Sequence, residues 1–312
     1  ELLIYGSLGT GTWLTQETKT RASSSYMLNL TVLPNTDGVS RTAYIYFVKV
    51  TDMESIVVEI VTIIQRGEVA SESTDYSSDK KVRVLQTAKL GKGLPIVLMG
   101  DGFIDTEIND GTYDAVMDKA FENLFTEEPI KSLRDYFNVY AVTAVSKHNI
   151  FGTGYETALG CELAGGNSTG ISGEDNAVQR YVQCVDNIDM SETLAVVILN
   201  SPAYAGTTYF GYTNQTKVVE FAIAYCPVIY DLQSESFRQV LVHEAVGHGF
   251  AKLEDEYAYQ ENGTISSKEI KNVQYLQTLG WAQNVDFTSD PSQVLWSAFL
   301  NDNRYVSEKL GV

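Results

Sequence analysis

The chain has 312 residues, is 44% hydrophobic and carries a formal net charge of −18. This length allows a buried core and two domains, whereas the acidity argues against nucleic acid as a partner, because phosphate binding needs a basic surface. Since no apolar run reaches the roughly 18 residues of a membrane span, the sequence predicts no transmembrane segment.

Residues 1–90 have the pattern of a small β-domain. Apolar and polar residues alternate in Tyr26–Val32 and Thr42–Val50, and a third β-rich run covers Ile56–Gln65. Short strands separated by polar turns predict a β-sandwich. The end of the third run, VEIVTIIQRG, resembles the last strand of small bacterial β-sandwich modules that precede secreted enzymes. The polar stretch Ala70–Lys81 is expected to be a linker or long loop.

Residues 91–312 alternate between strand and helix patterns and form the second expected domain. Strands alternating with helices predict an α/β catalytic domain, so that the whole chain is of the α+β class. The expected strands are Leu94–Met99, Phe137–Val145 and Leu194–Leu199, and the expected helices are Thr112–Leu124 and Phe237–Phe250.

The chain has 3 cysteines and no CxxC pair, so the sequence predicts no cysteine zinc site. Cys161 and Cys184 flank a stretch rich in Gly, Ser and Asn. A disulfide between them in an oxidising compartment is one expectation, and buried free thiols are the other.

The segment Val240–Tyr259 holds two of the chain's 3 histidines, His243 and His248, with Glu244 directly after the first. Neutral imidazole is the commonest nitrogen ligand of zinc. In HExxH peptidases two histidines at i and i+4 share one helix face and one metal, and the Glu at i+1 acts as general base. Here the histidines are five residues apart, and the motif is HExxGH.

The five-residue spacing does not suit a regular α-helix, in which the two rings would point about 140° apart. A one-residue π-bulge near Ala245–Gly247 would return both rings to one face, and such bulges concentrate at functional sites. Gly247 would let the backbone relax there. The spacing resembles the HExxGH motif of dipeptidyl peptidase III. The alternative is that the two histidines merely pack against or cap the helix.

A third ligand is expected among Glu254, Asp255 and Glu256, which follow His248 closely. A turn past the helix end could bring one of these carboxylates back to the metal, where a carboxylate is an ordinary zinc ligand at about 2.0–2.2 Å. The alternative for each of the three is a solvated acidic face.

Four ordered motifs together resemble the IgA-peptidase family of bacterial zinc metallopeptidases. In that family an HE-GH core is followed by Asp-Glu-Tyr, which here is Asp255-Glu256-Tyr257. The other three motifs are a strand with a Gly-Asp-Gly-Phe turn, a second strand, and an Asn-x-x-x-Tyr-x-Gly loop. They match IVLMGDGF at Ile96–Phe103, FNVYAV at Phe137–Val142 and VVILNSPAYAG at Val196–Gly206.

The resemblance implies a zincin-like catalytic domain in which Zn²⁺ is held by His243, His248 and Asp255. It implies that Glu244 is the general base, and it leaves Tyr257 either to hydrogen-bond a ligand or the developing oxyanion or simply to pack. It also implies a peptide or protein substrate and a secreted, periplasmic or cell-surface location in a bacterium. Because the family usually continues past the point where this sequence stops, the catalytic domain is expected to be incomplete at its C-terminus.

A rival function is a secreted glycan- or protein-binding surface protein with a structural or degenerate zinc site. The β-rich N-terminal part and the 19 tyrosines suit surface binding. Glu244 favours the peptidase, because a structural zinc site needs no base. We expect a monomeric endopeptidase, and a structural rather than catalytic role for Asp101 in the Gly-Asp-Gly turn.

Overall fold

The computed structural model describes most of residues 70–302 with their side chains, and it describes five N-terminal strands by their backbone alone. Side chains are described for residues 70–163, 170–209, 221–256, 264–300 and 302, and backbone alone for 210–213 and 218–220. Within these residues, no helix has both the length and the apolar character that crossing a membrane requires.

The five N-terminal strands form two antiparallel sheets, one of order β1-β4-β5 and one that pairs β2 with β3. The three strands expected from the sequence are confirmed as β3, β4 and β5. Their side chains lie outside the described residues, so the packing of the two sheets into a sandwich stays a prediction. The bounds are β1 Leu2–Ser7, β2 Leu14–Ala22, β3 Ser25–Val32, β4 Arg41–Val50 and β5 Ser55–Gln65.

The rest of the chain is built on a six-stranded sheet of order β12-β13-β11-β7-β8-β6. The four central strands are parallel, and the two edge strands, β12 and β6, are antiparallel to their neighbours. The bounds are β6 Val82–Gln86, β7 Leu94–Asp101, β8 Phe137–Val142, β11 Leu194–Leu199, β12 Thr207–Thr213 and β13 Val218–Pro227.

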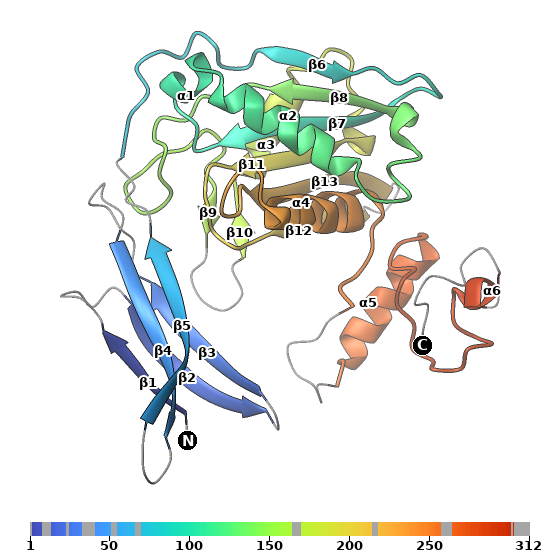
Figure 1. Ribbon diagram of the computed structural model, residues 1–312. Helices are drawn as coiled ribbons and strands as arrows, with labels where there is room; N and C mark the ends of the chain where they lie inside the picture. Colours follow the sequence, from blue (N-terminus) through green and yellow to red (C-terminus); the bar gives the residue numbers. More distant parts are fainter. Residues whose placement is uncertain are drawn as a thin grey trace.

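Helices cover both faces of this sheet, as Figure 1 shows. Along β11 alternate side chains enter two separate cores: Val196 packs with the α2 side, and Val197 packs with the α3 side. This explains why the central strands are apolar at every position, as expected for parallel strands buried on both faces. The helices are α1 Asp105–Asn109, α2 Thr112–Leu124 and α3 Asp175–Val182, followed by α4 Glu235–Val240 and η3 Leu241–Phe250.

The sheet begins earlier in the chain than the domain boundary expected after residue 90, because β6 belongs to it. The expected linker before β6 is also bound to this part of the fold. Ser73 donates its backbone N–H to the Lys147 carbonyl at 2.8 Å, and the N–H groups of Thr74 and Asp75 each lie 2.8 Å from Oδ2 of Asp105. These donors lower the pKa of Asp105.

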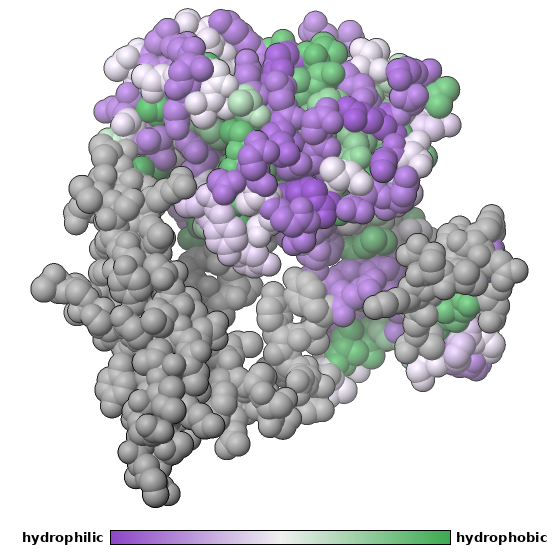
Figure 2. Space-filling model, viewed as in Figure 1, coloured by the Kyte–Doolittle hydropathy of each residue, from purple (hydrophilic) through white to green (hydrophobic). Residues whose placement is uncertain are grey.

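A small C-terminal region follows the sheet and consists of α5 (Ser267–Thr278), a turn, and α6 (Ser297–Leu300). Among its described residues only Trp281, Ala282 and Val294 are buried apolar residues. The face in Figure 2 is mostly hydrophilic where side chains are described, with smaller hydrophobic areas between. This surface fits the net charge of −18.

Candidate metal centre

The helix that carries the two histidines changes type along its length. Ser234 caps its start by accepting a hydrogen bond from the Phe237 N–H at 3.1 Å, and α4 then runs to Val240. From Leu241 to Phe250 the helix is a π-helix, in which backbone bonds join residues five apart. The predicted π-type irregularity is confirmed, but it covers ten residues instead of the single bulge expected at residues 245–247.

Close packing of this helix against the sheet needs a glycine at one position only. A Cβ added to Gly249 would lie 2.6 Å from Cδ1 of Leu194 on β11. At Gly247 the nearest atom to an added Cβ is the Val242 carbonyl oxygen at 3.6 Å, which is ordinary contact. The close approach of backbone and sheet therefore depends on Gly249, which the sequence did not single out.

The π-helix brings His243 and His248 together, and Asp255 joins them from the following turn. The two Nε2 atoms are 3.2 Å apart, and each lies 3.2 Å from Oδ1 of Asp255. Zinc bonds of about 2.0–2.1 Å in tetrahedral geometry require ligand atoms about 3.3 Å apart. The three atoms therefore fit three corners of a zinc tetrahedron, and they are the one such group of ligand atoms within the described parts of the chain.

The turn after the helix fixes the ring of His248. Lys252 has a left-handed backbone with φ of 55°, and the Leu253 N–H returns to the Gly247 carbonyl at 3.0 Å. This places the Leu253 carbonyl oxygen 2.6 Å from Nδ1 of His248. Since a carbonyl can only accept, Nδ1 must carry a proton, and in the neutral ring this tautomer leaves the Nε2 lone pair for a metal.

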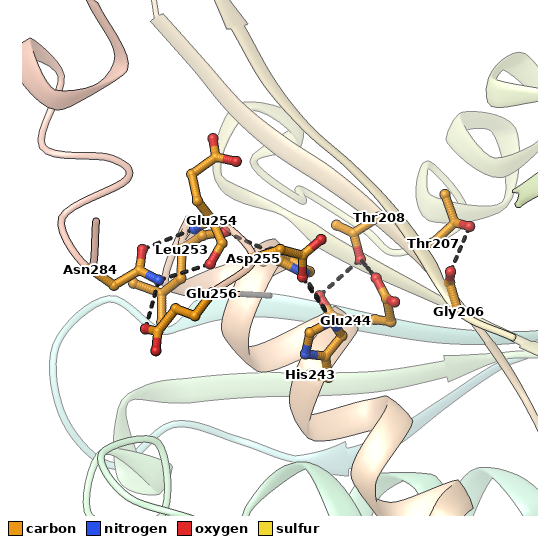
Figure 3. Close-up of polar contacts among 11 residues, drawn as sticks. Gly206, Thr207, Thr208, His243, Glu244, Leu253, Glu254, Asp255, Glu256 and Asn284 are labelled. Carbon is orange, nitrogen blue, oxygen red and sulfur yellow. Dashed lines mark hydrogen bonds and ion pairs between the residues drawn. The ribbon is translucent and has the colours of Figure 1, made fainter. Parts of the chain in front are cut away.

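Glu244 lies beside this triangle and is buried, with 7% of its surface exposed. The Thr208 hydroxyl on β12 donates to its Oε2 at 2.8 Å, as Figure 3 shows. A Cβ on Gly206 would lie 2.5 Å from Oε1, so the carboxylate occupies space that only glycine leaves free. Burial raises the pKa of Glu244, and the Thr208 hydrogen bond acts in the opposite direction.

The neighbours of Asp255 face a different partner. Glu256 accepts a hydrogen bond through Oε1 from Nδ2 of Asn284 at 2.9 Å, and the backbone of Glu254 bonds the same amide. In Figure 3 the Glu254 carboxylate extends away from His243. Of the three carboxylates that the sequence left open, the structure brings Asp255 to the histidine pair. Tyr257 lies outside the described residues.

Asp101 and the cysteines lie apart from this centre. Asp101 is fully buried and accepts hydrogen bonds from Thr157 Oγ1 at 2.7 Å and from the N–H groups of Leu159 and Cys161 at 2.9 and 3.0 Å. It therefore holds a loop, in line with the structural role expected for it. Cys161 and Cys184 are free thiols, the first buried and the second half-buried, which agrees with the free-thiol alternative and not with a disulfide between them.

Three contributors to the site were missed in the sequence: Thr208, Leu253 through its carbonyl, and Asn284. Thr208 had an indirect signal, because the Asn-x-x-x-Tyr-x-Gly loop ends at Gly206, two residues before it. Asn284 had none, since it lies 30 residues beyond Glu254 in a segment with no recognisable motif.

Comparison with known proteins adds two matches. The model of a family described as IgA Peptidase M64 matches residues 82–307. A second model, BACON, described as a putative N-terminal binding domain, matches residues 7–66. No curated protein matches the chain.

Proposed function

The chain belongs to the IgA Peptidase M64 family, and we propose that it hydrolyses peptide bonds at a zinc centre formed by His243, His248 and Asp255. The observation that carries the proposal is the triangle of three ligand atoms with 3.2 Å edges beside the buried carboxylate of Glu244. The catalytic unit is proposed to be zincin-like, with a mixed sheet and the metal-binding helix packed on one face.

Each residue has a distinct role in this proposal. When bound, zinc supplies Lewis acidity that activates a water and polarises the scissile carbonyl. Glu244 accepts the proton of the attacking water and later delivers it to the leaving amine. The hydrogen bond from Thr208 and the close contact with Gly206 hold one carboxylate rotamer for this transfer. Tyr257 remains a proposed partner of a ligand or of the oxyanion.

The openness of the centre supports an endopeptidase. The side chains of His243 and Asp255 are 45% and 43% exposed, so the ligand atoms are accessible from solvent, as an internal bond of a polypeptide would require. The substrate is proposed to be a peptide or protein. Cleavage of immunoglobulin A does not follow from the family name, since specificity resides in the loops around a site. A secreted, periplasmic or cell-surface location fits the BACON match at residues 7–66.

A second candidate function is surface binding with a structural zinc site, which the match to a putative binding domain at residues 7–66 favours. A surface-binding function with a structural zinc site provides no chemical role for Glu244. Burial of a carboxylate costs free energy that hydrogen bonding must offset, and a structural zinc site needs no base that would explain a carboxylate at this position. We therefore assign binding to the N-terminal residues at most, and hydrolysis to the family domain.

Replacement of Glu244 by Gln tests the proposal. The amide oxygen can still accept the Thr208 hydrogen bond, so fold and zinc should persist, whereas the amide cannot take a proton from water. General-base catalysis contributes about 10²–10⁴-fold, so a loss of that size in peptide cleavage is expected. Elemental analysis should find about one zinc per chain in both proteins. Wild-type cleavage by Glu244→Gln would contradict the mechanism whatever the metal content.

A further inference from the structure

One side chain of the C-terminal region, Asn284, forms hydrogen bonds with the segment that carries Asp255. Asn284, in the turn after α5, accepts a hydrogen bond through Oδ1 from the Glu254 N–H at 2.9 Å. Its Nδ2 donates to the Glu254 carbonyl at 2.8 Å and to Oε1 of Glu256 at 2.9 Å. Figure 3 shows that the amide reaches the residues on both sides of Asp255.

The same turn also holds the start of this segment. The Ala282 N–H donates to the Lys252 carbonyl at 2.8 Å, and the Lys252 ammonium lies 5.9 Å from the centre of the Trp281 ring. Contacts from the C-terminal region therefore fix both Lys252 and Glu254, and the backbone between them contains Leu253, whose carbonyl orients His248.

Among the described residues, the Asp255 carboxylate contacts the two histidine nitrogens that would share the metal with it. Its side chain is 43% exposed. An exposed aspartate on an unrestrained turn must lose conformational entropy to take up one position. The hydrogen bonds of Asn284 to Glu254 and Glu256, which we call the clamp, reduce this entropy cost before a metal binds.

We propose that Asn284 is a positioning residue that presents the Asp255 carboxylate to the metal, so that the C-terminal region completes the centre. This inference rests on the proposed function, because it assumes that the centre binds zinc. Asn284 would act through the backbone of Glu254 and the side chain of Glu256, to which its amide is hydrogen-bonded.

The adjacent residue supplies a matched control. Gln283 is also an amide that makes two hydrogen bonds, but its Nε2 donates to the Gln277 and Trp281 carbonyls at 3.2 and 3.0 Å. Both bonds stay within the C-terminal region. A general loss of order in the turn would therefore follow from either substitution, whereas a loss of positioning should follow only from a change at Asn284.

The test is a zinc competition titration of the full chain against a chromophoric chelator. Partners that orient metal ligands typically contribute 10–100-fold in metal affinity, so Asn284→Ala should bind zinc about 10–100-fold more weakly than wild type. Gln283→Ala should bind as wild type does. Asn284→Asp keeps the acceptor but sets a second carboxylate oxygen against Glu254 and Glu256, so it should weaken zinc binding at least as much.

A second readout separates positioning from folding. With saturating Co²⁺, the visible spectrum of Asn284→Asp should show altered coordination, while Gln283→Ala keeps the wild-type spectrum. Excess zinc should restore part of the hydrolysis to the Asn284 variants and none to Glu244→Gln. Wild-type zinc affinity in Asn284→Asp would overturn the inference while leaving the peptidase intact. If the wild-type chain itself bound no zinc, the proposed function would fall and this inference with it.

Discussion

The two carboxylates of the centre are held in opposite ways. Glu244 is 7% exposed, sits on the helix packed against the sheet, and is fixed by Thr208 and Gly206. Asp255 is 43% exposed, sits on a turn, and depends on Asn284 from the C-terminal region. In the proposed mechanism, the core would therefore set the geometry for proton transfer and the periphery would retain the metal, so the two properties should be separable by mutation.

Among substitutions near the two carboxylates, Gly206→Ala should produce the largest loss of peptide cleavage, and it should act through Glu244 without affecting zinc binding. The new Cβ would lie 2.5 Å from Oε1 and 2.8 Å from Cγ of Glu244, and 2.7 Å from Cγ2 of Val240, so both of these buried side chains must shift. The carboxylate should leave its position while the fold persists. We expect peptide cleavage to fall by about 10²–10⁴-fold, as for loss of the base, with zinc content unchanged by elemental analysis.

Gly247→Ala is the control for that substitution, because a Cβ there meets only the Val242 carbonyl oxygen at 3.6 Å. Cleavage and zinc content should both stay at wild-type levels. Equal losses of cleavage in the two alanine variants would show that the helix, and not the Glu244 carboxylate, is the sensitive element.

Asp255→Asn should instead weaken zinc binding. A neutral amide oxygen is a poorer zinc ligand than a carboxylate, so zinc affinity should fall by about 10²-fold, the upper end of the range for partners that act indirectly. Glu256→Gln should have a small effect, since an amide oxygen can still accept from Asn284. Measured zinc dissociation constants decide between them. A larger loss in Glu256→Gln would assign the third ligand to Glu256.

Removal of zinc should abolish peptide cleavage, and its effect on backbone hydrogen exchange should be small and confined to the Asp255 side. If the clamp formed by Asn284 strengthens zinc binding, then bound zinc must stabilise the clamp by the same free energy, because coupling between two sites is reciprocal. Hydrogen exchange should therefore accelerate in α5 and its turn after chelation, by about the 10–100-fold that the clamp contributes to zinc affinity. Exchange in β7 and β11 should not change. Uniform acceleration throughout the chain would show that no division exists between the two sides.

Part of the buried core could be predicted from local pattern, but the interior strand β13 and the helix α3 were missed. The helical spacing of Thr112–Leu124 gave the bounds of α2, and the apolar runs at Leu94 and Leu194 gave the starts of β7 and β11. Edge strands were missed: β6 is short and half-exposed, and β12 lies in a Gly/Tyr-rich stretch that reads as a loop. Such strands are defined by their neighbours more than by their own periodicity.

The site residues also divide into those that local spacing predicted and those that only the tertiary structure reveals. The spacing of His243 and His248 predicted the π-type helix, because one metal can be shared only if both rings face the same side. Asp255 was one of three possibilities, since the path of the turn depends on the left-handed backbone of Lys252. Thr208 and Asn284 reach the site from 36 and 30 residues away, and no local pattern encodes such contacts.

The π-helix also constrains how this motif can change over generations. The five-residue spacing and the ordinary four-residue spacing differ by one residue inside a helix, so a one-residue deletion between the two histidines or the substitution Gly247→His would place a histidine four residues after His243. At the present spacing, a helix that reverted to α geometry would turn the rings of His243 and His248 about 140° apart. The spacing of the histidines and the geometry of the helix must therefore change together if a single metal is to stay bound.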